Sequence, residues 1–582
     1  MKLSIDGGIY AISDDMFGGN ILANRDSLVG DSNFSELVED LGVTSLRYPG
    51  GSLTEYYFDI TDPDQTEIAD LTGNFNNDTS VKDFISLSDF MSFSSDNDIS
   101  VTIVIPTRTY LSDNTDENGD RYAEIDEDAL RTYVQELITG QYGDAEINAF
   151  EIGNEYWGSG EMSSVEYGRV SSEIAAIIDD ELYQASLSDE TAADIKILVQ
   201  SGHNWGVAKL SDEYEGVESS DVLTSLNESY GLDLDDDALY SDGSVNWTYV
   251  ANILIISEYN ESELAAVDGI TPHLYTSDSE FEDEVSYVTD QIYKTWGEVK
   301  DGVDIYVTEW NQNTSGYDLS SAEDYGLWQG QEILETFEEM VASGVDGADI
   351  WPLQQNTANA LSTGFSYEDL TPAGQVFSLM AESLPGKSLI ETSDDNASSD
   401  TYLYYGQGEV VMFISSKEDQ TISLDLSDIV SDLGDITAIK VGVSDPEETG
   451  SSNAETTLTE LVGDDLAEGT NISTSLAAGE ILQVSIVDFI PTEQFQIVMD
   501  DVDVLSEVSD HVDIDDDLLV NDESEVDEAD AESDDGMLGI PTVDVVDEVE
   551  DEDEDEDDGG GDDSMGFIGL ALLVPLALLG LA

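Results

Sequence analysis

"NAFEIGNEYWG", residues 148–158, joins a hydrophobic run typical of a buried strand to a polar turn. The run ends in Gly153, Asn154 and Glu155, and two aromatic residues follow. Gly and Asn are routine in surface turns, where a neighbouring Glu is simply solvated. A carboxylate at the end of a buried strand can equally be a catalytic or binding residue. The rest of the chain decides between these two interpretations.

Runs of strand length alternate with amphipathic stretches over the first 384 residues. The eight strand candidates are IYAISDDMFGGNIL (9–22), VTSLRYPGG (43–51), ISVTIVIPT (99–107), INAFEIGNE (147–155), DIKILVQSGHNW (194–205), VDGITPHLY (267–275), VDIYVTEWN (303–311) and VDGADIWPLQ (345–354). Eight strands with helices between them predict an α/β fold, a (β/α)8 TIM barrel. A doubly wound open sheet is the alternative, but no Gly-rich phosphate loop follows any early strand.

The hydrophobic pattern of the sequence changes after the predicted barrel. Short alternating runs with frequent turn residues predict a β-sandwich over 385–490, following a barrel domain over 1–384. The extended start MKLSIDGG (1–8) could add a strand to that sandwich. Residues 491–564 are acidic and poor in aromatic residues, which predicts a disordered linker.

Charge and composition exclude several classes of protein. The 582 residues include 132 Asp and Glu but only 15 Lys and Arg, for a net charge of −117. The first 490 residues alone carry −84, so the excess is not confined to the acidic linker. Such a surface repels nucleic acid and anionic lipid. The chain has no Cys, which excludes disulfides, thiolate metal sites and a Cys nucleophile.

Reactive side chains gather at the predicted strand ends, where a (β/α)8 barrel holds its active site. Glu155 ends the fourth strand, His273 and Tyr275 lie on the sixth, and Glu309 ends the seventh. Glycoside hydrolysis needs one carboxyl that protonates the leaving group and one carboxylate that attacks or activates water. The pair of Glu residues therefore predicts a glycosidase, with Glu155 and Glu309 as catalytic residues.

Other residues near these strand ends are candidates for contact with a sugar. Aromatic side chains offer flat walls to sugar C–H groups, Asn154 can bond a hydroxyl, and Arg47 can lie beside Glu309 and keep it ionised. Each also has a purely structural alternative, as a core histidine, a packing aromatic or a loop salt bridge. The substrate-binding candidates are Asn154, His273, Tyr275, Trp351, Arg47, Trp157 and Gln354, with Trp310 as a further aromatic wall.

At these motifs the chain resembles the clan A glycoside hydrolases. FEIGNEYW (150–157) and YVTEWNQN (306–313) carry the resemblance, which covers roughly residues 10 to 490. FGGN, LRYPGG and DGITPHLYT look most like the arabinofuranosidase branch, with its xylosidase and heparanase-like relatives. The resemblance implies a barrel followed by a sandwich, Glu155 as acid/base and Glu309 as nucleophile. It also implies retention of configuration, with carboxyl groups about 5 to 5.5 Å apart.

Two positions depart from the arabinofuranosidase pattern. That branch usually carries an acidic sugar ligand where this chain has Asn20 or a neighbour, and an Asn where this chain has Ser52. These departures concern the identity of the sugar and leave both Glu residues untouched. A plant or algal-type polysaccharide or oligosaccharide, arabinofuranosidase- or xylosidase-like, is the expected substrate.

No cofactor and no metal are expected. NTDENGDRYAEI (114–125) looks at first like a calcium loop, but it has Asn at position one and Ile at position twelve, where the EF-hand needs Asp and Glu. A solvated acidic loop is the better interpretation. The sequence leaves the oligomeric state open.

Two other classes of function remain. One is a non-catalytic carbohydrate-binding or surface exoprotein built on a glycosidase-like barrel; the other is a purely structural acidic exoprotein. The apolar run over 566–582 is near the lower limit for spanning a bilayer, about 17 residues. It predicts a membrane anchor or an export signal, and the start of the chain has no signal-peptide pattern. The expected location is extracellular or at the cell surface.

Overall fold

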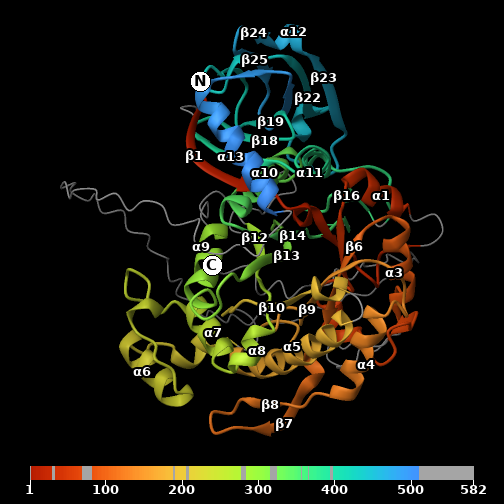
Figure 1. Cartoon of the computed structure of the whole chain (residues 1–582), viewed down its shortest axis with the longest axis vertical. Helices are drawn as coiled ribbons and strands as arrows, with labels where there is room; N and C mark the ends of the chain where they lie inside the picture. Colours follow the sequence, from red (N-terminus) through yellow and green to blue (C-terminus); the bar gives the residue numbers. More distant parts are fainter. Residues whose placement is uncertain are drawn as a thin grey trace, which may run out of the picture. The chain divides into compact units, whose positions relative to one another are not determined.

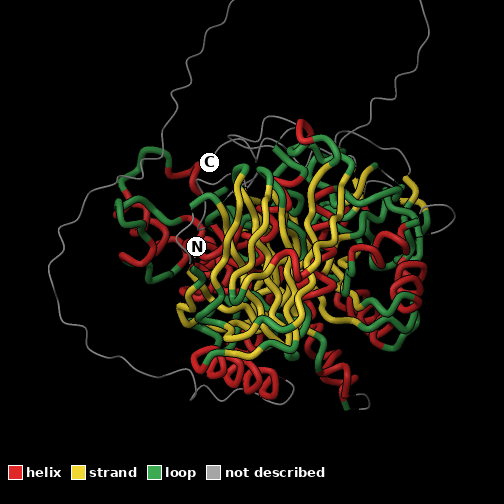
Figure 2. The backbone as a smooth tube through the Cα atoms, turned by 90° about the horizontal axis from the view of Figure 1, so that it is seen from above, coloured by secondary structure: helices red, strands yellow, loops and turns green. Residues whose placement is uncertain are grey.

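The computed structural model describes residues 2–28, 33–68, 82–187, 190–204, 209–276, 284–314, 324–355, 357–364, 366–393 and 397–509 (Figure 1). Seen from above, strands gather at the centre of the molecule and helices lie around them (Figure 2). The predicted segment 566–582 and most of the predicted linker lie outside the described residues.

A closed parallel barrel forms the first part of the fold and confirms the predicted fold class. Its order runs β2-β3-β6-β9-β10-β11/β12-β13-β14, and β14 pairs with β2 to close the ring. Pro272 has no N–H for the ladder and divides the sixth strand into β11 and β12. The strands are β2 (Gly18–Asn20), β3 (Ser45–Tyr48), β6 (Ser100–Ile105), β9 (Ile147–Ile152), β10 (Lys196–Gln200), β11 (Gly269–Thr271), β12 (His273–Thr276), β13 (Asp304–Gln312) and β14 (Gly347–Ile350).

Amphipathic helices connect successive strands. α1 is representative, because Phe34, Leu37, Val38 and Leu41 follow the helical repeat and are all buried. The main connecting helices are α1 (Phe34–Leu41), α3 (Leu87–Asp96), α4 (Glu127–Ile138), α5 (Ser164–Ser186), α7 (Trp247–Ile256), α9 (Glu284–Thr295), α10 (Leu327–Ala342) and α11 (Pro372–Ser383).

A β-sandwich follows the barrel. Its larger sheet has the order β1-β17-β18-β19-β26-β22-β23, all antiparallel, and it packs over a smaller sheet of order β20-β25-β24. The expected strand at the start of the chain is confirmed, since β1 pairs with β17 (Figure 1). The strands are β1 (Ser4–Ala11), β17 (Ser388–Ser393), β18 (Ser399–Gly406), β19 (Glu409–Ser416), β20 (Gln420–Asp425), β22 (Asp435–Val443), β23 (Thr456–Val462), β24 (Ala467–Glu468), β25 (Asn471–Leu476) and β26 (Ile481–Val487).

The structure departs from the predicted domain limits at two places. Residues 4–11 fall within the predicted range of the barrel domain, 1–384, but form the predicted extra strand of the sandwich sheet. Disorder was predicted from residue 491, yet α13 covers Glu493–Ser509. Phe495, Val498 and Val502, spaced one helical turn or two apart, are buried in the sandwich core. Acidic residues surround each of these apolar residues in the sequence. The average composition of the segment is therefore acidic and does not reveal the helix.

The acidic loop that resembled a calcium site is closed by its own side chains. The Asp116 carboxylate accepts N–H bonds from the main chain of residues 118, 119 and 120, and it forms a 2.6 Å ion pair with Arg169. The carboxylate most suited to a cation is therefore already paired.

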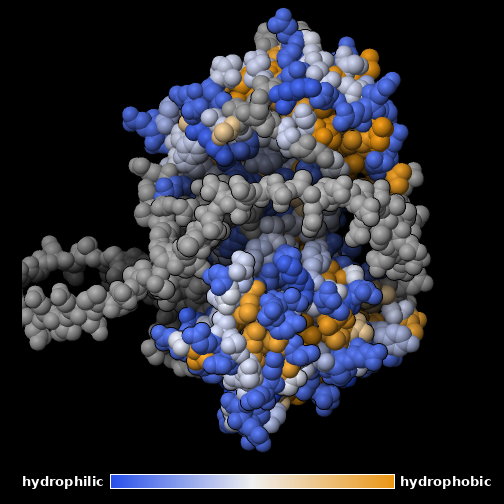
Figure 3. Space-filling model, turned by 90° about the vertical axis from the view of Figure 1, so that its left-hand side faces the viewer, coloured by the Kyte–Doolittle hydropathy of each residue, from blue (hydrophilic) through white to orange (hydrophobic). Residues whose placement is uncertain are grey.

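The surface is polar and holds no membrane-spanning helix among the described residues. Hydrophilic residues cover most of the described face in Figure 3, and hydrophobic ones form small patches between them. The predicted transmembrane segment over 566–582 lies outside the residues for which this finding holds.

Candidate active site

The reactive side chains predicted from the sequence meet at the carboxyl ends of the barrel strands. Arg47 lies on β3, Glu155 follows β9, His273 and Tyr275 lie on β12, and Glu309 lies on β13. The register places His273 directly beside Glu309. The fold thus brings four separate strand ends to one place, as their positions predicted.

Arg47 is the centre of the polar network below the site. It is fully buried, and all five of its N–H groups are bonded. Two bonds go to Glu151, at 2.6 and 2.9 Å, and one goes to Glu309 at 2.8 Å. The other two go to the side-chain oxygens of Asn20 and Asn154. Burial lowers the pKa of Arg47, but the two carboxylates outweigh it and raise the pKa overall.

Glu309 has both carboxylate oxygens held by donors. Oε1 accepts the bond from Arg47, and Oε2 accepts a 2.8 Å bond from the hydroxyl of Tyr275. Nδ1 of His273 lies 3.6 Å from Oε2. The carboxylate is 5% exposed, so these contacts fix both its position and its direction in a dry environment. Such an arrangement stabilises a negative charge aimed into the barrel mouth.

Glu155 lies opposite in a different setting. Its side chain is 20% exposed, and its nearest charged neighbour is Nδ1 of His273, 3.4 Å from Oε1. Its backbone has φ 44°, in the left-handed region that non-glycine residues seldom adopt and that gathers at functional sites. Gly153 has φ 79°, and a Cβ there would meet Thr107 at 3.0 Å. This tight turn explains why the strand ends in Gly-Asn-Glu.

His273 and Tyr275 lie next to the two carboxylates, and their pKa values reflect that charge. Burial lowers the pKa of His273, but Glu309 and Glu155 outweigh it, so the pKa rises overall. Burial and Glu309 raise the pKa of Tyr275 well above its usual value, which keeps its hydroxyl a hydrogen-bond donor. Burial together with the charge on His273 lowers the pKa of His203 to about 3, so that this second imidazole is neutral.

The two carboxylates lie close to each other. One oxygen of Glu155, one oxygen of Glu309 and one ring nitrogen of His273 are all within 4.8 Å of one another. Three such ligands could also hold a metal ion. The expectation that the site needs no metal therefore stays a prediction.

Sequence reasoning missed three supporting residues. Glu151 is fully buried in β9, and its signal was a charge inside a hydrophobic strand. Glu55 is also buried and accepts bonds from the main chain of Thr107, Arg108 and Asn154, which ties two strand ends together. His203 stacks on Trp157, with ring centres 4.5 Å apart. The motif SGHNW gave no sign of that contact.

The predicted sugar contacts divide into residues buried in the barrel wall and residues for which substrate contact stays a prediction. Arg47 lies beside Glu309, as predicted, and its five N–H groups are all bonded within the chain, so it positions Glu309. Trp310 is fully buried, with its ring centre 6.5 Å from that of Phe377, because alternation along β13 turns it away from Glu309. Asn154 is 1% exposed and bonded to Arg47 and Ser159, which leaves only one amide hydrogen for a substrate.

The remaining candidates are Trp351, Trp157 and Gln354. Trp351 is partly exposed, and its ring covers Gly51, where a Cβ would come within 2.8 Å of it. One face of Trp157 is covered by His203, and its edge meets His273. Gln354 is buried, and its Oε1 has no hydrogen-bond partner among the described residues. These three residues stay predicted substrate contacts.

The position that departed from the arabinofuranosidase pattern has a structural role. Asn20 is 1% exposed, donates to the main-chain oxygen of Thr308 at 2.9 Å and accepts from Arg47. It therefore orients the cation rather than facing a ligand. Ser52 precedes α2 (Leu53–Tyr57) and makes no side-chain cap bond.

Comparison with known proteins was made at the level of sequence and of structure. No protein-family model and no curated protein sequence matches the chain. Solved structures do match. One is an α-L-arabinofuranosidase from Thermotoga maritima in an arabinose complex, with a TM-score of 0.54 and 14% identity over 84% of this chain and 100% of that one.

Two further matches agree with the first. The family 51 α-L-arabinofuranosidase from Bifidobacterium longum has a TM-score of 0.54 and 13% identity, over 83% of this chain and 99% of that one. The α-L-arabinofuranosidase from Thermotoga petrophila has a TM-score of 0.54 and 15% identity over the same shares. The chain therefore has the fold of these clan A glycoside hydrolases, barrel and sandwich together, as the resemblance of its motifs implied.

Proposed function

We propose that the protein is a retaining glycoside hydrolase in which Glu309 is the nucleophile and Glu155 the acid/base. The observation that carries this proposal is the approach of the two carboxylates within 4.8 Å in unlike surroundings. Retaining enzymes hold their carboxyl groups about 5 to 5.5 Å apart, and inverting enzymes leave a wider gap for water. The short separation favours retention.

The roles follow from the contacts of each residue. Glu309, oriented by Arg47 and Tyr275, attacks the anomeric carbon while the glycosidic oxygen takes a proton from Glu155. The aglycone leaves, and a glycosyl ester on Glu309 remains. Glu155 then removes a proton from water, which attacks the anomeric carbon, releases the sugar and restores both carboxyl groups. Glu155 suits proton exchange because it is partly open to solvent.

The substrate class rests on the shared fold and on the motifs. Arabinofuranosidases are among the solved structures that share this fold, so an α-L-arabinofuranoside is the first substrate to test. Because Asn20 stands where the arabinofuranosidase branch usually has an acidic sugar ligand, a xyloside is the second substrate to test. Trp351 and Gln354 follow the last barrel strand, β14, and are the residues we expect to select between these sugars.

A panel of nitrophenyl glycosides tests the proposal directly. We expect cleavage of an arabinofuranoside or a xyloside by the wild-type protein and none by Glu309→Ala, with activity that survives dialysis against a chelator. The matched control is Glu161→Gln, which removes a carboxylate on the neighbouring loop that pairs with Arg108. Glycan binding without cleavage of any glycoside would support the non-catalytic alternative.

We also propose that the enzyme acts outside the cell, on its surface or beyond it. The apolar run over 566–582 and the strong negative charge of the whole chain support this location. Deletion of 566–582 followed by cell fractionation tests it. Unchanged export and unchanged membrane association would defeat the proposal.

A further inference from the structure

Gln200 is a fully buried side chain at the end of β10, beside the turn that carries Glu155. Its amide bonds to two parts of the site. Oε1 accepts a 3.1 Å bond from the main-chain N–H of Tyr156, and Nε2 donates a 3.3 Å bond to Oε1 of Glu151. Gln200 therefore joins the turn after β9 to the carboxylate that pairs with Arg47.

The partners of Gln200 fix the direction of its amide. The carboxylate of Glu151 is paired with Arg47 and can only accept, so it needs the NH₂ group of Gln200. A main-chain N–H can only donate, so Tyr156 needs the amide oxygen. An apolar residue in this place would bond to neither group, and a Glu would set a second carboxylate against Glu151.

The turn needs this support because Glu155 has a left-handed backbone conformation, with φ 44°. Such a conformation persists only where the surroundings hold it in several ways at once. A buried side chain holds the main-chain N–H on each side of Glu155. On one side Glu55 accepts the bond from Asn154 at 2.9 Å. On the other side Gln200 accepts the bond from Tyr156, and so helps to fix the backbone of the proposed acid/base.

We propose that Gln200 is a positioning residue for the acid/base, which keeps the turn of Glu155 at the separation from Glu309 that double displacement requires. The inference rests on the proposed function of these two residues. Gln200 bonds to Glu151. That carboxylate shares Arg47 with Glu309, so one buried network connects the two catalytic positions. A displacement of about 1 Å in such a network can lower a rate by roughly 10²-fold.

Two variants separate the hydrogen bonds of Gln200 from its volume. Gln200→Met keeps the length of the side chain and loses both bonds. Gln200→Glu keeps the shape and the acceptor, but the introduced carboxyl can donate to Glu151 only while it is protonated. Since that proton is lost as the pH rises, the defect should grow from about pH 5 to about pH 9. A space-filling role would predict no change with pH.

Kinetics measure the effect on catalysis. Gln200→Met should lower kcat/KM on a natural glycoside by roughly 10²-fold. The first step on a dinitrophenyl glycoside should be nearly unaffected, because that leaving group needs no proton. Gln200→Glu should show the same selective loss, and only at the higher pH values. Equal losses on the two substrates, or a Gln200→Glu defect that is independent of pH, would overturn the inference.

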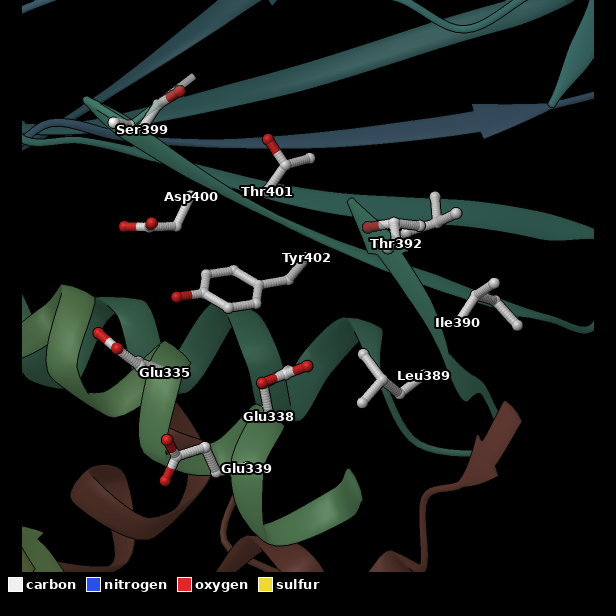
Figure 4. Close-up of a pocket in the computed structure, with 12 residues that line it drawn as sticks. Glu335, Glu338, Glu339, Leu389, Ile390, Thr392, Ser399, Asp400, Thr401 and Tyr402 are labelled. Atoms are coloured by element: carbon white, nitrogen blue, oxygen red, sulfur yellow. The ribbon is translucent and has the colours of Figure 1, made fainter. Parts of the chain in front are cut away.

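Two control variants change groups away from this network. Gln291→Met removes another buried amide, which lies on α9 and accepts a 2.7 Å bond from Asn246. Glu338→Gln removes a partly buried carboxyl beside a cavity of about 570 Å³ between α10 and strands β17 and β18 (Figure 4). The lining of that cavity includes none of the residues bonded to Gln200. Both controls should affect natural and activated glycosides alike, and a selective loss in either one would also overturn the inference.

Hydrogen exchange without substrate follows the same turn independently of catalysis. The main-chain amides of residues 153–162 should exchange roughly 2- to 10-fold faster in Gln200→Met than in the wild type, the equivalent of one lost hydrogen bond. They should exchange at the wild-type rate in Gln291→Met and Glu338→Gln. A wild type that cleaves no glycoside would defeat the proposed function, whereas unchanged exchange of this turn in Gln200→Met would overturn the inference.

Discussion

Glu309 and Glu155 occupy the same barrel mouth but differ in every contact. Glu309 is 5% exposed and takes hydrogen bonds from Arg47 and Tyr275 on its two oxygens. Glu155 is 20% exposed, contacts only His273 among the described ion pairs, and stands on a left-handed backbone position. One carboxylate is therefore fixed in direction by donors of the chain itself, and the other is partly open to solvent.

The proposed mechanism gives these two identical residues different roles because their surroundings differ. A nucleophile needs a fixed direction and a stabilised negative charge, whereas an acid/base needs access to a proton. In this proposal, the donors on β3 and β12 serve Glu309 on β13, and the turn after β9 serves Glu155. The substitutions below test this difference.

The largest effect is expected from removal of the nucleophile. Glu309→Ala should lower kcat by roughly 10⁴-fold or more on every substrate, because no other group attacks the anomeric carbon. Stopped assays with natural and activated glycosides measure this loss. A variant that still cleaves an activated glycoside at a tenth of the wild-type rate would place the nucleophile elsewhere.

Removal of the acid/base should depend on the leaving group. Glu155→Gln should lose roughly 10²- to 10⁴-fold on a natural glycoside, the usual contribution of general acid catalysis. The first step on a dinitrophenyl glycoside should be nearly unaffected, because that leaving group needs no proton. The size of the pre-steady-state burst measures it, and equal losses on both substrates would contradict the difference between the two Glu residues.

Substitution of Arg47 should remove the cation that holds Glu309 in place. Arg47→Met leaves the buried Glu151 and Glu309 without their shared cation, and breaking a buried pair in this way costs about 3 to 5 kcal/mol. Chemical unfolding measures the loss of stability. The matched control is Lys294→Met, which breaks the exposed ion pair of Lys294 with Asp290 on α9 and should cost about 1 kcal/mol or less.

The smallest effect concerns the second donor to Glu309. Tyr275→Phe removes one hydrogen bond to a charged group, about 1.5 to 3 kcal/mol, which is roughly a 10- to 150-fold loss in kcat/KM. We expect the loss on every leaving group alike, unlike that of Glu155→Gln. A loss confined to natural glycosides would show that Tyr275 serves the leaving group instead.

The sequence alone predicts the barrel, the sandwich and the two Glu residues at the strand ends. The barrel can be predicted because hydrophobic runs of strand length alternate with helical patterns. Glu155 and Glu309 can be predicted as site residues because each ends one of those runs. The residues that support them are harder to predict. Glu55 looks like an ordinary acidic residue until folding brings it to the main-chain N–H of Arg108. Glu151 differs only as a charge inside a hydrophobic strand, and its partner Arg47 is distant in the chain.

The errors share a physical cause as well. Trp310 is expected to face the substrate because it lies at a strand end, but side chains alternate along β13, and Trp310 is buried on the side away from Glu309. The stripe of α13 was missed because acidic residues surround each apolar one. In each case the decisive information is a contact between residues far apart in the sequence.

The anomer released first from a cleaved glycoside shows whether the reaction retains or inverts configuration. Proton NMR of the reducing sugar in the first seconds of hydrolysis, before mutarotation, distinguishes the two outcomes. The close approach of Glu155 and Glu309 predicts a product with the configuration of the substrate. A product of inverted configuration would contradict the account, since the two carboxylates would then have to act across a water molecule.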